Sequence, residues 1–305
     1  MGRDPGDLYE VSPDATEPDR DLAMLYYLDG FIDAGGAGRL LATHLTSSLE
    51  REEVARFDVD ALIDYRSRRP VMEYAKDHWE SYETPELTLS LLRDSEGSQF
   101  LLLNGLEPDR EWEAFTAAVR QLTASLGVRL SVGFHGIPMG VPHTRQLGVT
   151  AHSTQPGLLD GYRPLVDKLQ VPGSAAALLE YRLGQEDRAA VGFAVHVPHY
   201  LAQASYPASA VTLLESVQRA TGLMLPGDAL REAAQRTDEE IARQVEGSAE
   251  VTEVVQALEQ QYDAFTADRE NLLGSDNEMP TAEELGAEFE RFLAEQQGRG
   301  DTPES

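Results

Sequence analysis

The segment over residues 29–38 reads DGFIDAGGAG and is the first candidate for chemistry. It lies between an expected strand and an expected helix, where free backbone amides and the helix dipole can hold an anion. A phosphate-binding P-loop would need Lys directly after Gly35, where Gly36 stands instead. Asp29 and Asp33 would also repel phosphate. We therefore favour a tight turn that lets the helix pack closely on the sheet, with a nucleotide site as the alternative.

Five of the seven histidines fall where expected strands end, which is the edge at which open α/β sheets usually place ligands. They are His135, His143, His152, His196 and His199. No H-E-x-x-H or other zinc spacing occurs among them, and a proline separates His196 from His199. We therefore expect hydrogen-bonded structural histidines and no metal site, with a metal ligand or a general base as the alternative.

The glycine loop and the strand ends together define a candidate cleft. Its members are Asp29, Asp33, Gly35, Gly36, His135, His143, Arg145, His196 and His199. An enzyme built on this cleft would be a phosphorylase or hydrolase of a small nucleoside-like substrate. No G-x-S-x-G elbow accompanies it, and Ser174 is more simply the N-cap of the Ala-rich helix that follows. The sequence therefore assigns no catalytic residue and no cofactor.

The densest positive cluster lies over residues 64–70, which read DYRSRRP in an otherwise acidic chain. Tyr65, Arg66, Arg68 and Arg69 are of the residue types favoured at protein interfaces. They form either internal ion pairs with neighbouring acids or a docking surface. In both cases the segment is a contact element.

Composition excludes several classes of protein. The 305-residue chain contains no cysteine, which excludes disulfides, thiolate nucleophiles and cysteine-based metal sites. Its formal net charge of −28 repels phosphate backbones, so we do not expect nucleic acid as a partner. No apolar run approaches the roughly 20 residues that a membrane helix needs. The N-terminus has no apolar stretch behind a basic start, so we expect a cytoplasmic protein.

Strands and helices are expected to alternate along the first two thirds of the chain. Strands are expected over Leu22–Leu28, Val54–Val59, Leu87–Leu92, Gln99–Asn104, Val128–Phe134, Leu147–His152 and Ala190–Val197. Helices are expected over Ala37–Leu49, Arg110–Leu126, Ala175–Leu183 and Pro207–Thr221. Alternation predicts a three-layer α/β/α fold, and the continuous apolar strands predict a sheet covered on both faces.

The strand signal stops after Gly227, and the rest of the chain carries 21 Asp and Glu against 6 Arg. One helical stripe is formed by Val251, Val254, Val255, Leu258, Tyr262 and Phe265. A polar linker is expected over Asn271–Met279, followed by a helix opened by a Thr281 and Glu284 capping box. We expect a disordered segment over 1–21, an α/β core over 22–226, an acidic helical appendage over 227–296 and a flexible tail over 297–305.

Several of these segments, taken in order, resemble the bacterial branch of the proteasome assembly chaperone 2 family. They are the loop from Asp29, the basic cluster, NGLEPD at 104–109, GIPM through PHTR at 136–145 and VHVPHY at 195–200. The resemblance covers residues 22–292. It implies an α/β/α core similar to the purine nucleoside phosphorylase and hydrolase-like folds, usually assembled into homo-oligomers.

The resemblance also implies a link to the 20S proteasome, which eukaryotic and archaeal relatives help assemble or bind. Archaeal relatives that bind proteasomes carry a C-terminal hydrophobic–Tyr–any tripeptide, whereas this chain ends TPES. We do not expect docking by that route. Our leading interpretation is a non-enzymatic, oligomeric, chaperone-like protein whose partners are itself and, as candidates, proteasome subunits. Self-association is expected through the appendage or through the segment of Arg66, Arg68 and Arg69.

Overall fold

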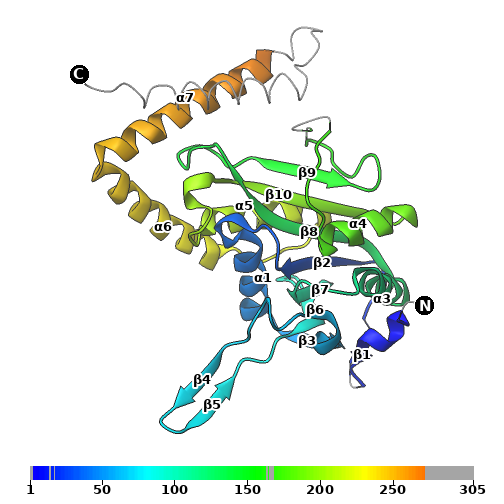
Figure 1. The fold of residues 1–305 in the computed structure, drawn as a ribbon. Coiled ribbons are helices and arrows are strands. Elements are labelled where there is room, and N and C mark those ends of the chain that lie inside the picture. The colour runs from blue at the N-terminus through cyan, green and yellow to red at the C-terminus, as the bar shows by residue number, and fades with distance from the viewer. Residues whose placement is uncertain (1–2, 14, 17, 163, 165–167, 272–305) are drawn as a thin grey trace.

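The computed structural model describes residues 3–13, 15–16, 18–162, 164 and 168–271. An eight-stranded sheet runs through the core, with strand order β1-β3-β6-β7-β2-β8-β10-β9 (Figure 1). The strands are β1 (Tyr9–Val11), β2 (Leu22–Asp29), β3 (Arg51–Phe57), β6 (Leu87–Arg93), β7 (Gln99–Leu106), β8 (Val128–Met139), β9 (Val149–Ser153) and β10 (Ala190–Pro198). The four central strands β7, β2, β8 and β10 are parallel, and the outer strands are antiparallel to their neighbours.

Helices cover both faces of this sheet, as the sequence predicts. One face packs against α1 (Ala37–Ser48) and α5 (Pro207–Thr221), and the other packs against α3 (Trp112–Ser125) and α4 (Ala175–Gln185). A single turn, α2 (Val59–Leu62), follows β3. The fold is therefore a three-layer α/β/α sandwich.

Strand β2 explains why this part of the sequence is a continuous apolar run. Leu25 and Tyr27 belong to the core cluster on the α1 side, whereas Met24 and Tyr26 belong to the cluster on the α3 side. Successive side chains of a strand point to opposite faces, so a strand covered on both sides must be apolar throughout. The apolar strands predicted from the sequence are confirmed.

The chain path creates a crevice between β2 and β7. These two strands are parallel neighbours. Strand β2 leads into α1 on one face, whereas β7 leads into α3 on the other. At such a topological switch point the two connections diverge, and the crevice beyond the carboxyl ends of the strands is where α/β proteins bind ligands.

A two-stranded hairpin was not expected from the sequence. Strands β4 (Met72–Ala75) and β5 (His78–Tyr82) pair with each other in a second, separate sheet. The hairpin projects away from the three-layer core (Figure 1). Lys76 takes φ = 56° at its tip, a left-handed conformation that a tight hairpin turn requires.

The expectation of disorder over residues 1–21 is wrong for residues 5–11. A short 3-10 helix over Pro5–Leu8 leads into β1, which pairs antiparallel with β3. Leu8 is fully buried in the core cluster on the α3 side. The segment was expected to be disordered because it is rich in Asp and Pro. Its order depends on the burial of Leu8, a tertiary contact that the local sequence does not indicate.

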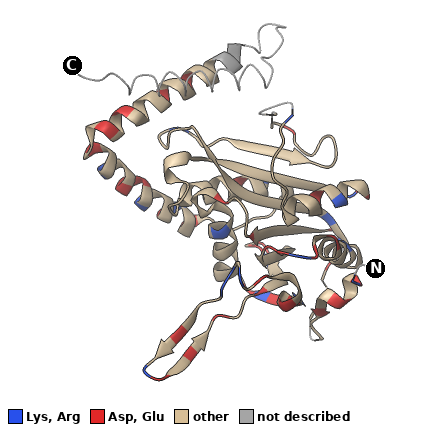
Figure 2. Ribbon diagram, in the orientation of Figure 1, with Lys and Arg blue, Asp and Glu red and all other residues tan. Residues whose placement is uncertain are grey.

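Two helices form an arm after the core. Helix α6 (Asp228–Glu246) begins directly after Gly227 and packs against α5 through Leu230 and Ala234. Helix α7 (Ala249–Asn271) turns away from α6, and acidic residues are spread along both helices (Figure 2). The expected polar linker beyond Asn271, the capping box of Thr281 and Glu284, the last helix and the tail lie outside the described residues. Among the helices that the structure describes, none is long and apolar enough to cross a membrane.

Candidate functional site

The carboxylate of Asp33 fills the anion position at the start of α1. Its Oδ1 accepts the backbone N–H groups of Gly38 and Gly136, each at 2.9 Å. Its Oδ2 accepts the backbone N–H of Arg39 and the hydroxyl of Tyr27, each at 3.0 Å. Negative charge at a helix N-terminus is stabilising. The protein therefore supplies its own anion where a phosphate would otherwise bind.

The two loop glycines make a tight turn rather than a phosphate cradle. Gly35 and Gly36 have φ of 68° and 60°, a left-handed conformation that favours glycine. The N–H of Gly35 donates to the carbonyl of Ala202 at 2.8 Å, and the Gly35 carbonyl accepts from the N–H of Tyr206 at 2.9 Å. The N–H of Gly36 donates to the Asp33 carbonyl at 3.0 Å. These loop amides are thus used within the protein.

Tyr27 links the two acids of this loop. Its hydroxyl donates to Asp33 and also lies 3.3 Å from Oδ1 of Asp29. Burial, together with the charges of Asp33 and Asp29, raises the pKa of Tyr27 far above its ordinary value. Tyr27 is therefore a permanent hydrogen-bond donor, which fixes the end of β2 against the start of α1.

Arg68 clamps the basic cluster to the end of the sheet. Its Nη1 donates to the carbonyls of Asp29 at 2.8 Å and Glu107 at 2.9 Å, and its Nη2 lies 3.1 Å from Asp109. Gly30 makes room for it, because a Cβ there would lie 2.4 Å from the guanidinium. Arg68 is an internal structural residue and is not available to a partner.

The rest of the basic cluster divides between internal and exposed side chains. The Tyr65 hydroxyl donates to Asp60 at 2.5 Å. Arg66 and Arg69 are exposed, and neither guanidinium has a partner among the described residues. Internal contacts therefore account for Tyr65 and Arg68, whereas Arg66 and Arg69 stay candidates for a docking surface.

His143 and His199 both contact Tyr200. The Tyr200 hydroxyl accepts the backbone N–H of His143 at 2.9 Å and lies 2.7 Å from its ring Nδ1. The His199 ring packs edge to face on Tyr200 with centroids 5.4 Å apart. Burial lowers the pKa of His143, which keeps its ring neutral and suited to this hydrogen bond.

Arg145 holds α7 against the loop between β8 and β9. Its guanidinium makes two 2.8 Å contacts with Asp263 and one of 3.1 Å with Glu259. The Tyr262 hydroxyl adds a bond to the Gln146 carbonyl at 3.0 Å. Arg145 therefore binds the acidic arm rather than facing a cleft.

The remaining histidines lie on the sheet, and two of them have hydrogen-bond partners of their own. His196 is buried, and its Nε2 lies 2.8 Å from the hydroxyl of Thr150. His152 lies 2.7 Å from Oε1 of Glu180. Burial lowers the pKa of His135, and the charge of the nearby His152 lowers it further. The residues of the candidate cleft thus separate into the Asp33 turn, the Tyr200 group and these sheet histidines.

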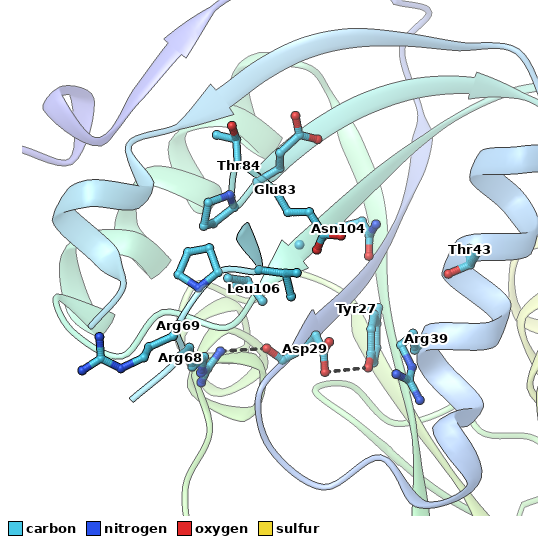
Figure 3. Close-up of a pocket in the computed structure, with 15 residues that line it drawn as sticks. Tyr27, Asp29, Arg39, Thr43, Arg68, Arg69, Glu83, Thr84, Asn104 and Leu106 are labelled. Atoms are coloured by element: carbon cyan, nitrogen blue, oxygen red, sulfur yellow. Dashed lines mark hydrogen bonds between the residues drawn. The ribbon is translucent and has the colours of Figure 1, made fainter. Parts of the chain in front are cut away.

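A pocket of about 380 Å³ opens at the switch point between β2 and β7 (Figure 3). Asp29, Tyr27 and Asn104 line it from the strands, and Arg39 lines it from α1. Apolar walls come from the base of the hairpin and from the end of β7. They are Pro70, Val71, Pro85 and Leu106. Only Asp29 among these was in the predicted cleft.

The hairpin carries a cluster of exposed large side chains. They are Val71 (57% exposed), Met72 (46%), Tyr74 (60%), Trp79 (62%) and Tyr82 (47%). Tyr74 and Trp79 contact each other edge to face with ring centroids 5.2 Å apart. The signal for this surface was present in the aromatic residues over 72–82, but only the structure places them on a projecting element.

Fold and site together define an α/β/α sheet protein with a projecting hairpin, a helical arm and a pocket at its switch point. The model of the PAC2 family matches residues 27–245, so the chain belongs to the PAC2 family. The resemblance read from the sequence is thereby confirmed. No protein with a curated description matches the chain.

Solved structures give the same fold. A Mycobacterium tuberculosis protein of unknown function is 50% identical with a TM-score of 0.84, covering 87% of this chain and 91% of that one. A Corynebacterium glutamicum protein of unknown function is 37% identical with a TM-score of 0.81, covering 84% and 97%. A Mycobacterium tuberculosis proteasome-assembly chaperone homologue is 22% identical with a TM-score of 0.70, covering 77% and 100%.

Proposed function

We propose that this protein is a non-enzymatic, chaperone-like protein that self-associates and binds other proteins, with proteasome subunits as candidate partners in the cytoplasm. The exposed apolar cluster on the β4–β5 hairpin carries the proposal. Within the residues that the structure describes, these strands pair only with each other, so the cluster contributes little to the core sheet. Its role therefore lies outside the monomer's own fold.

The physical argument is one of exposed apolar area. An isolated two-stranded hairpin is at best marginally stable in water. Contiguous exposed apolar side chains mark interaction sites, and Trp, Tyr and Met are enriched at interface cores. A partner that covered Trp79 and Tyr74 would bury this area and order the hairpin at the same time.

The comparisons support the choice of partner. One structure with this fold is described as a proteasome-assembly chaperone homologue and is 22% identical to this chain. We therefore choose proteasome subunits as the first partners to test. The exposed Arg66 and Arg69 at the base of the hairpin would add positive charge to an interface on an otherwise acidic chain. Such a charge steers association and gives specificity.

The geometry gives less support to the phosphorylase or hydrolase alternative. That reaction would need an acid or base and an anion-binding group directed at one substrate. The Asp33 carboxylate already has four hydrogen-bond donors, and Arg145 is paired with Asp263 and Glu259. We therefore base the proposal on the hairpin.

Light scattering of the purified full chain tests self-association. For the wild type we expect a mass of two or more times 33.5 kDa, the mass of one chain. For the Tyr74→Ser, Trp79→Ser double variant we expect the mass of a single chain. Tyr181→Ser is the matched control, because Tyr181 is 60% exposed on α4, away from the hairpin. A wild-type monomer at micromolar concentration would contradict self-association.

Pull-down from the native cytoplasm tests the partner. We expect proteasome subunits to be captured by the wild type and by Tyr181→Ser, and to be lost with the hairpin double variant. Capture of proteasome subunits by all three proteins alike would exclude the hairpin as the binding surface. Capture of none by the wild type would contradict the proteasome link.

A further inference from the structure

On the side formed by β2 and α1, the pocket at the β2–β7 switch point contains one uncompensated charge of each sign. Arg39 is exposed on the first turn of α1, and its guanidinium has no hydrogen bond or ion pair among the described residues. The Asp29 carboxylate is also exposed. Within the described structure it makes one contact, in which its Oδ1 lies 3.3 Å from the Tyr27 hydroxyl. Both residues line the same cavity.

Hydrogen bonds fix the wall between these two charges. Oδ2 of Asp33 accepts from both the Tyr27 hydroxyl and the Arg39 backbone N–H, so the first turn of α1 is held beside Tyr27. The same Tyr27 hydroxyl lies against Asp29. In Figure 3 Tyr27 lies between Asp29 and Arg39. Hydrogen bonds thus hold the backbone at Asp29 and Arg39 in fixed positions on either side of Tyr27.

Among the other charged residues of the pocket, Arg68 and Glu86 are paired, whereas Arg69 and Glu83 at the base of the hairpin have no side-chain partner in the described part of the chain. Arg68 is bound to Asp109, and Glu86 lies 3.1 Å from Arg56. Asn104 lines the pocket with a side-chain amide that has no partner in the described part of the chain. A half-buried amide is a donor and acceptor for a polar ligand.

We propose that this pocket binds a free amino acid with an apolar side chain, as the zwitterion. The carboxylate of the ligand would pair with Arg39 and its ammonium group with Asp29, which satisfies both charges with no net charge brought in. The apolar side chain would lie against Pro70, Val71, Pro85 and Leu106. A cavity of about 380 Å³ is within the range of small-molecule sites.

Electrostatics disfavour the obvious competitors. Among the described residues, the unpaired charged side chains of the pocket are Arg39, Arg69, Asp29 and Glu83, whose charges sum to zero. A phosphate or nucleotide would therefore leave the pocket with an excess of two or more negative charges next to Asp29 and Glu83. A simple amine would leave Arg39 unpaired, and a simple carboxylic acid would leave Asp29 unpaired. Like charges at close range cost free energy and opposite charges gain it.

Calorimetry of the full chain with L-leucine tests the proposal, with 4-methylpentanoate and isoamylamine as probes that each lack one charged group. We expect L-leucine to bind more tightly than either. Arg39→Ala should weaken L-leucine and 4-methylpentanoate at least tenfold and leave isoamylamine unchanged. Asp29→Asn should weaken L-leucine and isoamylamine and leave 4-methylpentanoate unchanged.

Arg51→Ala is the matched control, because Arg51 is exposed at the start of β3 and does not line the pocket. It should bind L-leucine as the wild type does. No binding of L-leucine at millimolar concentration would overturn the proposal. So would binding that neither Arg39→Ala nor Asp29→Asn weakens, or tighter binding of inorganic phosphate than of L-leucine.

Discussion

The N–H of Gly136 on β8 donates to the carboxylate of Asp33 at 2.9 Å, across 103 residues of chain. The same carboxylate caps α1 and accepts from Tyr27. One side chain therefore joins two neighbouring parallel strands and the helix that packs on them. Stability should depend on it more than its place in a loop implies.

Asp33→Ala should lower the free energy of unfolding by about 2–3 kcal/mol, because a helix cap and charge-assisted hydrogen bonds are lost together. Asp33→Asn keeps one acceptor oxygen and should lose about 1 kcal/mol. Urea unfolding followed by circular dichroism measures both. Asp77→Ala at the hairpin tip, where the side chain is 92% exposed, is the control and should change nothing. Equal stability of Asp33→Ala and the wild type would show that these bonds contribute no net stability.

Gly30→Ala should destabilise the protein by about 1–3 kcal/mol, the usual cost of overpacking. Its Cβ would lie 2.4 Å from the Arg68 guanidinium and 2.7 Å from Cβ of Glu107. In an Arg68→Ala background, Gly30→Ala should lower the free energy of unfolding by less. Some destabilisation should stay, because the new Cβ would still collide with Glu107. A double-mutant cycle in urea gives the coupling. An unchanged cost in the two backgrounds would mean that Arg68 is not what Gly30 accommodates.

The His152 and Glu180 pair should make stability depend on pH. Burial disfavours the charged ring of His152, but the hydrogen bond and charge of Glu180 outweigh it and raise the pKa of His152 above 6.5. The His152 ring therefore binds a proton more tightly in the folded state than in the unfolded state. The resulting stability is fully present below the unfolded pKa of about 6.5 and is lost as pH rises through the folded pKa.

Glu180→Gln should lower the pKa of His152, measured by NMR titration of the ring protons, and should destabilise the protein more at pH 5 than at pH 8. Glu250→Gln, at an exposed position on α7, supplies the comparison. A His152 pKa that is the same in Glu180→Gln and the wild type would contradict this account.

Arg145→Ala should release α7 from the core. Its contacts with Asp263 and Glu259 are the ion pairs between α7 and the β8–β9 loop in the described structure. We expect faster hydrogen exchange of α7 amides and earlier proteolysis within the helix, with no change in the core sheet. Salt should reproduce part of the effect in the wild type, because exposed ion pairs are screened.

Arg243→Ala is the control for that experiment, because Arg243 pairs with Glu240 within α6. It should leave α7 exchange unchanged. If Arg145→Ala exchanges like the wild type, then the apolar contact of the buried Val255 holds the arm instead.

Local sequence patterns were enough for most of the core. Strands β2 and β10 are apolar at nearly every position because both faces are covered, and that composition can be read without a structure. Ser174 was predicted as an N-cap, and its hydroxyl accepts the N–H of Ala177 at 3.1 Å. The start of α1 at Ala37 followed from periodicity. These features depend on neighbours a few residues away, so the sequence contains their cause.

Tertiary structure alone decided what these elements present to a ligand or a partner. Asp33 and Gly136 lie far apart in sequence, as do Arg39 and Asn104, and no local pattern links them. The β4–β5 hairpin escaped prediction because its strands are short and pack on no core. Apolar and polar residues alternate only over Met72, Glu73 and Tyr74, and the pairing shifts register directly after Glu73. The sequence determined which segments become strands and helices, since that choice is local. The pocket and the exposed hairpin arise only when the chain path brings distant segments together, because long-range contacts are set by how the whole sheet packs.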